Sequence, residues 1–433
     1  MLRVSRCCKS AEMISGVGIS NELKRRIKME VDLLERPPCL AVLLVGERED
    51  SLRYVKHKKI AADACGIKFV PITLSADISQ QQLNHEIIRV GNAGDIDAVL
   101  LQLPLPPHLS ARQALFMINP SKDVDGLHPL NFGNLFLQDR RPLAAALSNA
   151  DKSEEGDTVV DDLLVDNHDD GTFKRVSWRS HERRYFIPCT ALAVRTLLFS
   201  HLNRKYHFFS TNVHPHQSQK ASLRTVIVNK SMVVGIPTSA LLLKEGHFNV
   251  TLCSRSDSLD DIRRLTKDAD VLITAYGSPK VFDASFVKKG AIVVDVAINS
   301  AEPNSTSPHT TRICGDMDVE SVSGVASAIT SVPGGVGPLT VAHLMQNVVK
   351  AYHLRRSNKS TFSKLYECFL NVNSTEVTRE FPANGSNSDG SHATTKRTPM
   401  ITALKCKTKN STKYDECFPL LTLTDLFFSP YKT

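Results

Sequence analysis

Tyr54 and Lys58 stand four residues apart in a segment, residues 50–64, whose pattern predicts a helix. At this spacing the two side chains share one face of the helix. An aromatic ring can stack on a flat heteroaromatic ligand, while a neighbouring amine can move protons. The alternative is a pair on a solvated helix face, which is the commoner situation for tyrosine and lysine at this spacing.

Gln102 lies at the carboxyl end of a predicted buried strand, residues 98–103, which Pro104 ends. In open α/β sheets, ligands bind beyond the carboxyl ends of the strands. Gln102 is therefore placed to contact a ligand, although a polar residue that only ends a strand would give the same pattern.

Asp123 and Asp125 stand two residues apart, directly ahead of Gly126. Such a pattern is typical of a turn or a metal-binding loop, but the other ligands of a calcium loop are absent from the sequence. We therefore expect no metal here. A carboxylate that binds a donor-rich ring is the remaining functional interpretation.

The segment Val332-Pro-Gly-Gly-Val-Gly-Pro338 holds three glycines and two prolines in seven residues. It predicts a rigid loop with few side chains, and such a loop lets the backbone approach a ligand closely. Taken alone, the segment could equally be a tight connector between two elements.

These segments lie in a chain in which helix and strand patterns alternate. Before residue 104 the apolar pattern predicts helices at 19–34 and 50–64 and strands at 39–45, 69–74 and 98–103. Ser79 is expected to cap a further helix. After residue 225 the pattern predicts helices at 235–243 and 339–352 and strands at 225–228, 249–253, 271–275 and 291–296. The fold class is therefore α/β, with two doubly wound units built on parallel sheets.

Three segments interrupt this alternation. Residues 144–184 are rich in aspartate and glutamate and predict an inserted, mobile acidic loop. Residues 201–220 are rich in histidine, asparagine and serine and predict a second long loop. Residues 356–433 are of low complexity, and we expect a disordered tail.

The composition narrows the class of ligand. A net charge of +8 is compatible with nucleic acid or with anionic small molecules. Because the sequence has neither zinc-finger spacing nor a basic helix interleaved with aromatic residues, we expect phosphate-bearing small molecules and no nucleic acid. The apolar runs are too short to span a bilayer, so we expect no membrane partner.

The cysteines and the first residues bear on the compartment. Ten cysteines without a CxxC pair indicate reduced thiols. The basic stretch Met1 to Lys9 contains no acid, and it is compatible with a mitochondrial presequence or with a disordered N-terminus. We slightly favour a mitochondrial over a cytosolic location.

Together, and in this order, the segments closely resemble the signatures of the methylenetetrahydrofolate dehydrogenase/methenyltetrahydrofolate cyclohydrolase family. The matching blocks are Tyr54-Val-Lys-His-Lys58, Gln102-Leu-Pro-Leu-Pro106, Lys122-Asp-Val-Asp-Gly126, Phe186-Ile-Pro-Cys-Thr190 and Pro333-Gly-Gly-Val-Gly-Pro-Leu-Thr340. The resemblance covers residues 13–354 apart from the first two interruptions, and it leans to the mitochondrial branch of the family.

The resemblance implies a two-domain architecture. An N-terminal folate-binding α/β domain would span 12–143 and be completed by the helix 339–354. A C-terminal Rossmann-type NAD(P) domain would span 185–338, with a cleft between the two domains. Members of the family usually form homodimers through the cofactor domain, so a homodimer is expected.

The resemblance also implies roles for residues of the folate site. Lys58 would be the catalytic lysine, Gln102 would hydrogen-bond and position it, and Tyr54 would stack on the pterin-side ring system. Asp125 would hold the pterin. The rest of the implied folate pocket consists of Leu101, Leu103, Pro333, Gly334, Gly335, Val336 and Gly337.

The implied cofactor is NADP or NAD, and this half of the chain departs from the family pattern. Where the family has glycine, arginine or alanine, and then serine, this chain has Asn229, Lys230 and Ser231, followed by Gly235. Asparagine is the best substitute for glycine in a left-handed turn, which we therefore expect at Asn229. Lys230 and Arg255 favour NADP, or NAD with an inorganic anion. The other implied cofactor residues are Thr190 and Ile298.

The implied function is NAD(P)-dependent oxidation of 5,10-methylenetetrahydrofolate to 5,10-methenyltetrahydrofolate, followed by hydrolysis to 10-formyltetrahydrofolate. Two alternatives stay open. One is a member of the family that retains only cyclohydrolase activity, because the folate blocks match better than the cofactor blocks. The other is a non-catalytic paralogue that acts as a binding or scaffold protein.

Overall fold

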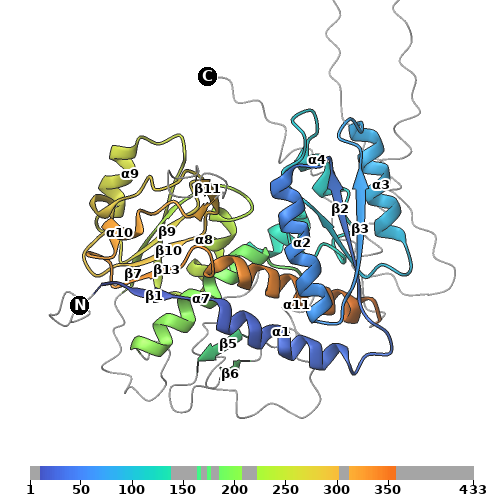
Figure 1. Ribbon diagram of the computed structural model, residues 1–433, viewed down its shortest axis with the longest axis horizontal. Coiled ribbons are helices and arrows are strands. Elements are labelled where there is room, and N and C mark those ends of the chain that lie inside the picture. The colour runs from blue at the N-terminus through green and yellow to red at the C-terminus, as the bar shows by residue number, and fades with distance from the viewer. Residues whose placement is uncertain are drawn as a thin grey trace, which may run out of the picture. The chain divides into compact units, whose positions relative to one another are not determined.

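A parallel sheet of three strands carries the N-terminal half of the chain. In the computed structural model, which describes residues 10–137, 163–166, 173–176, 185–206, 222–301 and 312–356, these strands lie in the order β3-β2-β4. They are β2 (Cys39–Val45), β3 (Lys68–Leu74) and β4 (Ala98–Leu101). Every residue of β2 is buried, as expected for a central strand covered on both faces. Figure 1 shows the sheet with its helices.

Five of the described helices accompany this sheet in the chain, and a capping interaction fixes the start of one of them. They are α1 (Val17–Val31), α2 (Glu49–Ala64), α3 (Gln80–Asn92), α4 (Ala111–Phe116) and α5 (Pro129–Leu137). Ser79 caps α3, since its hydroxyl accepts from the Gln82 amide while the Gln82 side chain accepts from the Ser79 amide. The predicted cap at Ser79 is confirmed.

A second sheet contains six parallel strands in the order β1-β13-β10-β9-β7-β8. They are β1 (Glu12–Ile14), β7 (Leu223–Val228), β8 (Phe248–Cys253), β9 (Val271–Thr274), β10 (Ile292–Asp295) and β13 (Ala328–Thr330). The predicted α/β class with two parallel sheets is confirmed. Strand β1, although first in the chain, pairs with β13, with Met13 opposite Ile329.

The elements that connect this sheet are α7 (Cys189–Tyr206), α8 (Gly235–Lys244), α9 (Leu259–Thr266), the short helix η3 (Ala284–Phe286) and α10 (Val319–Val322). A small antiparallel pair, β11 (Asn299–Ala301) and β12 (Arg312–Cys314), follows β10. No helix in the described ranges is long and apolar enough to cross a membrane.

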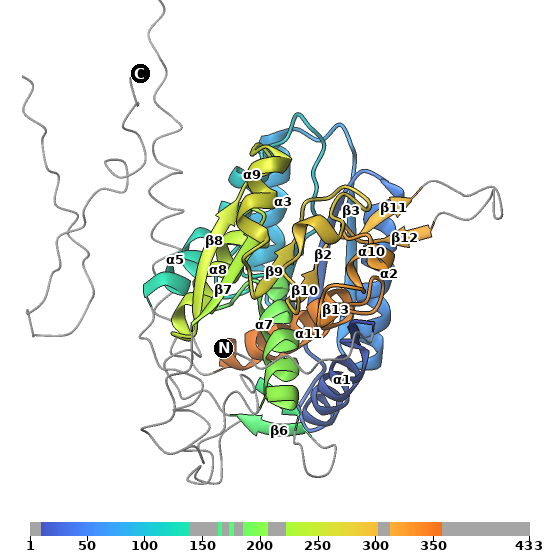
Figure 2. The same cartoon turned by 90° about the vertical axis from the view of Figure 1, so that its left-hand side faces the viewer.

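Helix α11 (Val336–Arg356) ties the elements of the two sheets together. It packs against α7 and α1 and also contacts α2, β2 and β4. Figure 2 shows α7 and α11 side by side. Almost every residue from Leu339 to Tyr352 is buried, so this helix is surrounded rather than amphipathic. All of these elements lie in one compact unit of the chain, Met1–Val377.

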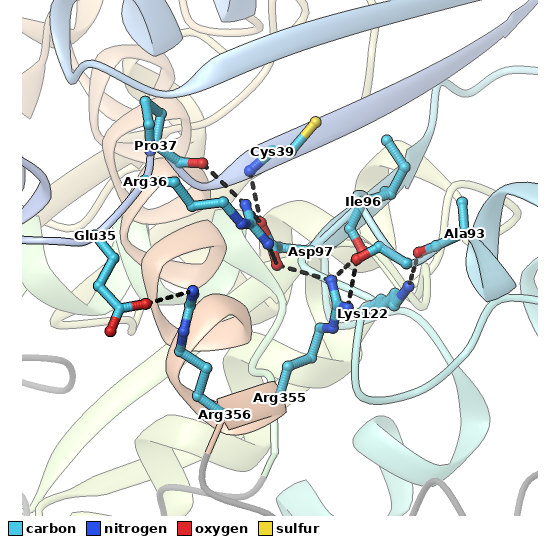
Figure 3. Close-up of polar contacts among 11 residues, drawn as sticks. Glu35, Arg36, Pro37, Cys39, Ala93, Ile96, Asp97, Lys122, Arg355 and Arg356 are labelled. Atoms are coloured by element: carbon cyan, nitrogen blue, oxygen red, sulfur yellow. Dashed lines mark hydrogen bonds and ion pairs between the residues drawn. The ribbon is translucent and has the colours of Figure 1, made fainter.

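A buried carboxylate fixes the end of α11 to the first sheet (Figure 3). Asp97, only 1% exposed, accepts two hydrogen bonds from Arg36 at 2.7 and 2.8 Å and one from the Cys39 amide at 2.9 Å. Arg355 donates to the same carboxylate at 2.8 Å and to the Ile96 carbonyl at 2.7 Å. Two guanidinium groups therefore satisfy a carboxylate that would be costly to bury alone.

The structure differs from the sequence analysis within both internal interruptions. Helix α7 continues to Tyr206, although a loop was expected from His201, because His201 and Leu202 are buried and tertiary packing outweighs local polarity. Within 144–184 two short strands, β5 (Leu163–Asp166) and β6 (Phe173–Val176), pair antiparallel; both segments contain β-prone apolar residues. The remainder of these interruptions, residues 1–9 and the predicted tail from 357 lie outside the described residues.

Candidate active site

Lys58 and Gln102 meet at the carboxyl end of β4. Lys58 projects from α2, and its Nζ donates to Gln102 Oε1 at 2.8 Å. The Gln102 amide is itself oriented, because its Nε2 donates to the Leu103 carbonyl at 2.6 Å. Its backbone N–H donates to the Leu43 carbonyl at 2.9 Å and so continues the ladder beyond β4. Gln102 therefore offers Lys58 an acceptor in a fixed position.

The surroundings of the Lys58 amine favour its neutral form. Burial lowers the pKa of Lys58, and the negative charge of Asp125 opposes that shift without cancelling it. A lysine in such a place releases its proton more readily than a lysine in water. It can therefore accept and return a proton near neutral pH.

Asp125 lies in the turn between α4 and α5 and interacts electrostatically with this lysine. Gly126 has a φ of +71°, and a Cβ there would lie 2.6 Å from the Ile187 carbonyl carbon, so only glycine fits. Through this contact the turn packs against the segment that precedes α7. Burial raises the pKa of Asp125, while Lys58 and the Cys189 thiol lower it. Asp125, Lys58 and Cys189 thus form one electrostatic cluster.

The neighbouring aspartate, Asp123, bonds to groups that hold the turn together. Asp123 accepts hydrogen bonds from the His128 amide at 2.7 Å and from Asn131 Nδ2 at 2.9 Å. Burial raises its pKa to about 6. Lys122 Nζ donates to the Ala93 carbonyl at 2.9 Å. Of the charged residues in this motif, Asp125 is therefore the one beside the catalytic candidate Lys58.

A cavity of about 820 Å³ lies between α2 and the glycine-rich loop. Tyr54, 40% exposed, and His57 line it from α2, while Ala297 and Ile298 line it from the second sheet. The whole predicted loop also lines it: Pro333, Gly334, Gly335, Val336 and Gly337. The volume and the mixed lining suit a drug-sized aromatic ligand.

Other residues of the predicted folate set do not line this cavity. Lys58, Gln102 and Asp125 are not among the lining residues of the cavity. Leu101 is 3% exposed and belongs to the core of the first sheet, and Leu103 packs against that core. The structure therefore places Leu101 in the packing that supports Gln102.

The glycine-rich loop contacts the turn between β1 and α1. Gly334 has a φ of +107°, and its carbonyl accepts a hydrogen bond from the Gly16 amide at 2.9 Å. A Cβ on Gly16 would lie 2.2 Å from the Gly335 carbonyl oxygen. Gly16 is thus a supporting residue that the sequence analysis missed, since its partner is far away in the chain.

Asn229 closes the turn between β7 and α8 with its side chain. Its Oδ1 accepts from the Ser231 amide at 2.8 Å and from the Gly235 amide at 3.0 Å, and its Nδ2 donates to the Ala275 carbonyl at 2.7 Å. The predicted left-handed conformation is wrong: Lys280 is the only non-glycine with a positive φ among the described residues. Hydrogen bonds from the Asn229 side chain close this turn, where a left-handed backbone was expected to close it.

Lys230 and Arg255 lie after β7 and β8, at neighbouring strand ends. Lys230 Nζ is 3.8 Å from Asp257 Oδ2. The Arg255 guanidinium lies 5.2 Å from the centroid of the Tyr276 ring and donates to Ser278 Oγ at 3.2 Å. Both side chains are solvent-accessible, so two positive charges are available to an anionic ligand at this edge of the sheet.

Comparison with known proteins identifies the family. Residues 14–125 match the model described as tetrahydrofolate dehydrogenase/cyclohydrolase, catalytic domain. Residues 210–356 match its NAD(P)-binding domain. The chain belongs to the tetrahydrofolate dehydrogenase/cyclohydrolase family. Its predicted membership is thereby confirmed.

Individual members of the family are similar over nearly their whole length. The bifunctional protein FolD of Anoxybacillus flavithermus is 33% identical over 346 residues, which cover 79% of this chain and 98% of the relative. The crystal structure of FolD from Campylobacter jejuni is 31% identical, with a TM-score of 0.60, and covers 80% of this chain and all of the other. A Trypanosoma brucei FolD structure, complexed with NADP and an inhibitor, is 28% identical, with a TM-score of 0.62, over 81% of this chain and all of the other.

The NAD(P)-binding domain of this family member fits a dinucleotide. The parallel strands β7, β8 and β9 end at one edge, where Lys230 and Arg255 supply positive charge. Thr190, in the first turn of α7, is partly exposed. Ile298 lines the cavity.

Asp316 is a supporting residue of this domain that the sequence analysis missed. Its carboxylate accepts from the Tyr276, Gly277 and Ser278 amides at 2.5, 2.9 and 3.0 Å, and from Asn299 Nδ2 at 2.9 Å. It therefore fixes the loop that follows β9. The sequence shows an aspartate directly after a glycine, Gly315, but it does not show that the aspartate is buried or which groups it contacts.

Proposed function

We propose that this chain oxidises 5,10-methylenetetrahydrofolate with NAD(P) and hydrolyses the methenyl product to 10-formyltetrahydrofolate. One observation carries the assignment to residues: Gln102 holds the desolvated Lys58 amine, and Tyr54 of the same helix lines a cavity of suitable size. Membership of the family supports the reaction, and this geometry supports Lys58 as the group that moves protons. The catalytic roles below are part of the proposal.

In the oxidation, the protein binds and shields the folate. The nicotinamide of a bound NAD(P) would accept the hydride that leaves the methylene carbon. Tyr54 and the glycine-rich loop both line the cavity and would hold the ring system between an aromatic face and bare backbone. The loop brings few side chains, so the reacting carbon can approach the second domain closely.

In the hydrolysis, Lys58 moves the protons. Water adds to the cationic methenyl carbon, and neutral Lys58 accepts the proton that the water loses. The hydroxyl of the adduct then loses its proton to solvent as it becomes the formyl carbonyl. The bond from this carbon to one ring nitrogen breaks, and Lys58 returns its proton to that nitrogen. Gln102 keeps the amine in place throughout, because its own orientation is fixed by the Leu103 carbonyl.

Asp125 is proposed to bind the donor-rich edge of the pterin. A carboxylate accepts charge-assisted hydrogen bonds from ring N–H and amino groups. Its charge also limits how far burial lowers the pKa of Lys58. Asp125 would therefore tune the proton carrier as well as orient the substrate.

The two basic residues of the cofactor domain support NADP, or NAD with an inorganic anion, as the cofactor. Lys230 and Arg255 could pair with a 2′-phosphate, or with an inorganic anion beside NAD. The homodimer expected from the family is likewise a proposal, and sedimentation equilibrium of the full chain would test it.

The test is the fate of methenyltetrahydrofolate absorbance with and without NAD(P). We expect the wild type to form the chromophore only with NAD(P) and to hydrolyse it in either case. Lys58→Met should abolish hydrolysis. Lys59→Met is the matched control, because Lys59 is exposed and pairs with Asp63 at 2.8 Å. Hydrolysis without oxidation would support the cyclohydrolase-only alternative, and neither activity would support the scaffold alternative.

A further inference from the structure

Helix α11 contributes a buried amide directly behind the Asp125 turn. Asn347, 5% exposed, donates from Nδ2 to the Val124 carbonyl at 2.8 Å and lies 3.4 Å from Cys189 Sγ. The Val124 carbonyl belongs to the peptide that joins Val124 to Asp125. One side chain of α11 thus holds both the backbone of the turn and the thiol beside its carboxylate.

Cys189 completes the connection. Its thiol donates to the same Val124 carbonyl at 3.3 Å and also lies against Asp125. Burial and the neighbouring Asp125 raise the pKa of Cys189 well above its ordinary value, so the thiol stays protonated and remains a donor. A continuous path therefore runs from Asn347 through Cys189 to Asp125, and from there to Lys58.

Packing alone does not explain an amide at this point. The neighbours of Asn347 along α11 include buried apolar residues, among them Leu344 and Val348. A buried amide costs free energy unless it is hydrogen-bonded, and leucine has nearly the same size without that cost. Unlike leucine, the amide can hydrogen-bond the Val124 carbonyl and the Cys189 thiol and so hold both in place.

Helix α11 is held in place at its last turn and contributes to the cavity at its first turn. Its first residues belong to the glycine-rich loop that lines the cavity, and Arg355 fastens its last turn to Asp97 (Figure 3). A single anchored helix therefore sets the cavity wall at one point and the Asp125 turn at another.

We propose that Asn347 is a positioning residue for the cyclohydrolase reaction, holding the Asp125 carboxylate at its place beside Lys58 through Val124 and Cys189. This inference rests on the proposed role of Lys58. It differs from a structural role in one measurable respect: displacing Asp125 alters the ionisation of Lys58. Because Asp125 raises the pKa of Lys58, Asn347→Leu must lower that pKa.

His343 provides the matched control on the same helix. It is also buried, and its ring nitrogens lie 3.0 Å from Thr196 Oγ1 and 3.0 Å from Gln346 Oε1. The contact with Thr196 joins α11 to α7, the contact with Gln346 lies within α11, and neither involves Asp125 or Lys58. His343→Leu therefore reports what the loss of a buried polar contact does to the fold alone.

The experiment measures the ionisation of Lys58 directly, by competitive acetylation of the full chain across pH and quantification of the labelled peptide. Asn347→Leu should lower the midpoint for Lys58, and His343→Leu should not. Because a displaced Asp125 would bind the pterin less well, cyclohydrolase kcat/KM should fall about tenfold in Asn347→Leu, while the lower pKa of Lys58 moves the acid limb of the pH profile to lower pH. An unchanged Lys58 midpoint would overturn the proposal.

The labelling readout needs no activity, so an inactive wild type would refute the proposed function and leave this test intact. If Asn347→Leu does not fold, Cys189→Ser and Cys189→Ala replace it. The serine keeps a donor to the Val124 carbonyl and should retain the Lys58 midpoint, whereas the alanine should lower it. Equal midpoints in the two variants would likewise refute the path through Cys189.

Discussion

Lys58 Nζ donates to Gln102 Oε1 at 2.8 Å, and this glutamine has no freedom to turn its amide round, because Nε2 already donates to the Leu103 carbonyl. Lys58 therefore faces a hydrogen-bond acceptor both when its amine is protonated and when it is neutral. A neutral acceptor stabilises the ammonium less than a carboxylate would. It orients the amine while leaving desolvation as the main influence on the pKa of Lys58.

Gln102→Glu should move the pH dependence of hydrolysis in a defined direction. A carboxylate in place of the amide favours the charged form of Lys58 and raises its pKa. Since the neutral amine is the active form, the acid limb of the kcat profile should shift to higher pH, and activity at neutral pH should fall about tenfold. Gln113→Glu, exposed on α4, is the control. A profile that keeps its acid limb would contradict the role of Lys58.

Asn229→Gly should lower the stability of the cofactor-free protein and strengthen the binding of the cofactor at the β7–α8 turn. The change removes three hydrogen bonds, which should cost about 1–3 kcal/mol in the cofactor-free protein. It also releases the Ser231 and Gly235 amides, which a phosphate can use. We expect a lower Tm without NADP and a larger rise in Tm when NADP is added. A smaller rise than in the wild type would show that Asn229 assists binding.

The parts of the site that the sequence predicted depend on local rules. Tyr54 and Lys58 share a face because a helix has a fixed pitch, and Gln102 points to the ligand edge because strands of a parallel sheet end together. Those rules need no knowledge of side-chain contacts.

The parts that it missed depend on distant partners or on a choice between two local conformations. Asn347 lies in a helix that is buried all round, where apolar periodicity carries no signal, and its partners Val124 and Cys189 are distant in sequence. Asn229 suits a left-handed turn and a side-chain-closed turn equally well, and only the position of Ala275 decides between them. His201 lies in a polar segment that tertiary packing holds in a helix.

Asp97→Asn should loosen the last turn of α11. The substitution removes the charge that Arg36 and Arg355 share, while leaving one acceptor for the Cys39 amide. Because both arginines are partly exposed, the loss should be about 2–3 kcal/mol of the free energy of unfolding rather than that of a fully buried pair. Urea denaturation would measure it, with the exposed Asp77→Asn as control. A loss no larger than that of the control would contradict the anchoring of α11.

Asp295 should make the protein less stable as pH rises towards neutrality. Burial, with the nearby Asp316, raises the pKa of Asp295 from 3.8 to about 7. Between these values the native state holds a proton that the unfolded chain has lost, so stability is highest at the acid end of the window and falls as pH rises through it. Asp295→Asn stays neutral and should flatten this slope by up to about 1.4 kcal/mol per pH unit. Urea unfolding of both proteins from pH 4.5 to 7.5 would show it, with the exposed Asp268→Asn as control, and parallel slopes would exclude a protonated Asp295.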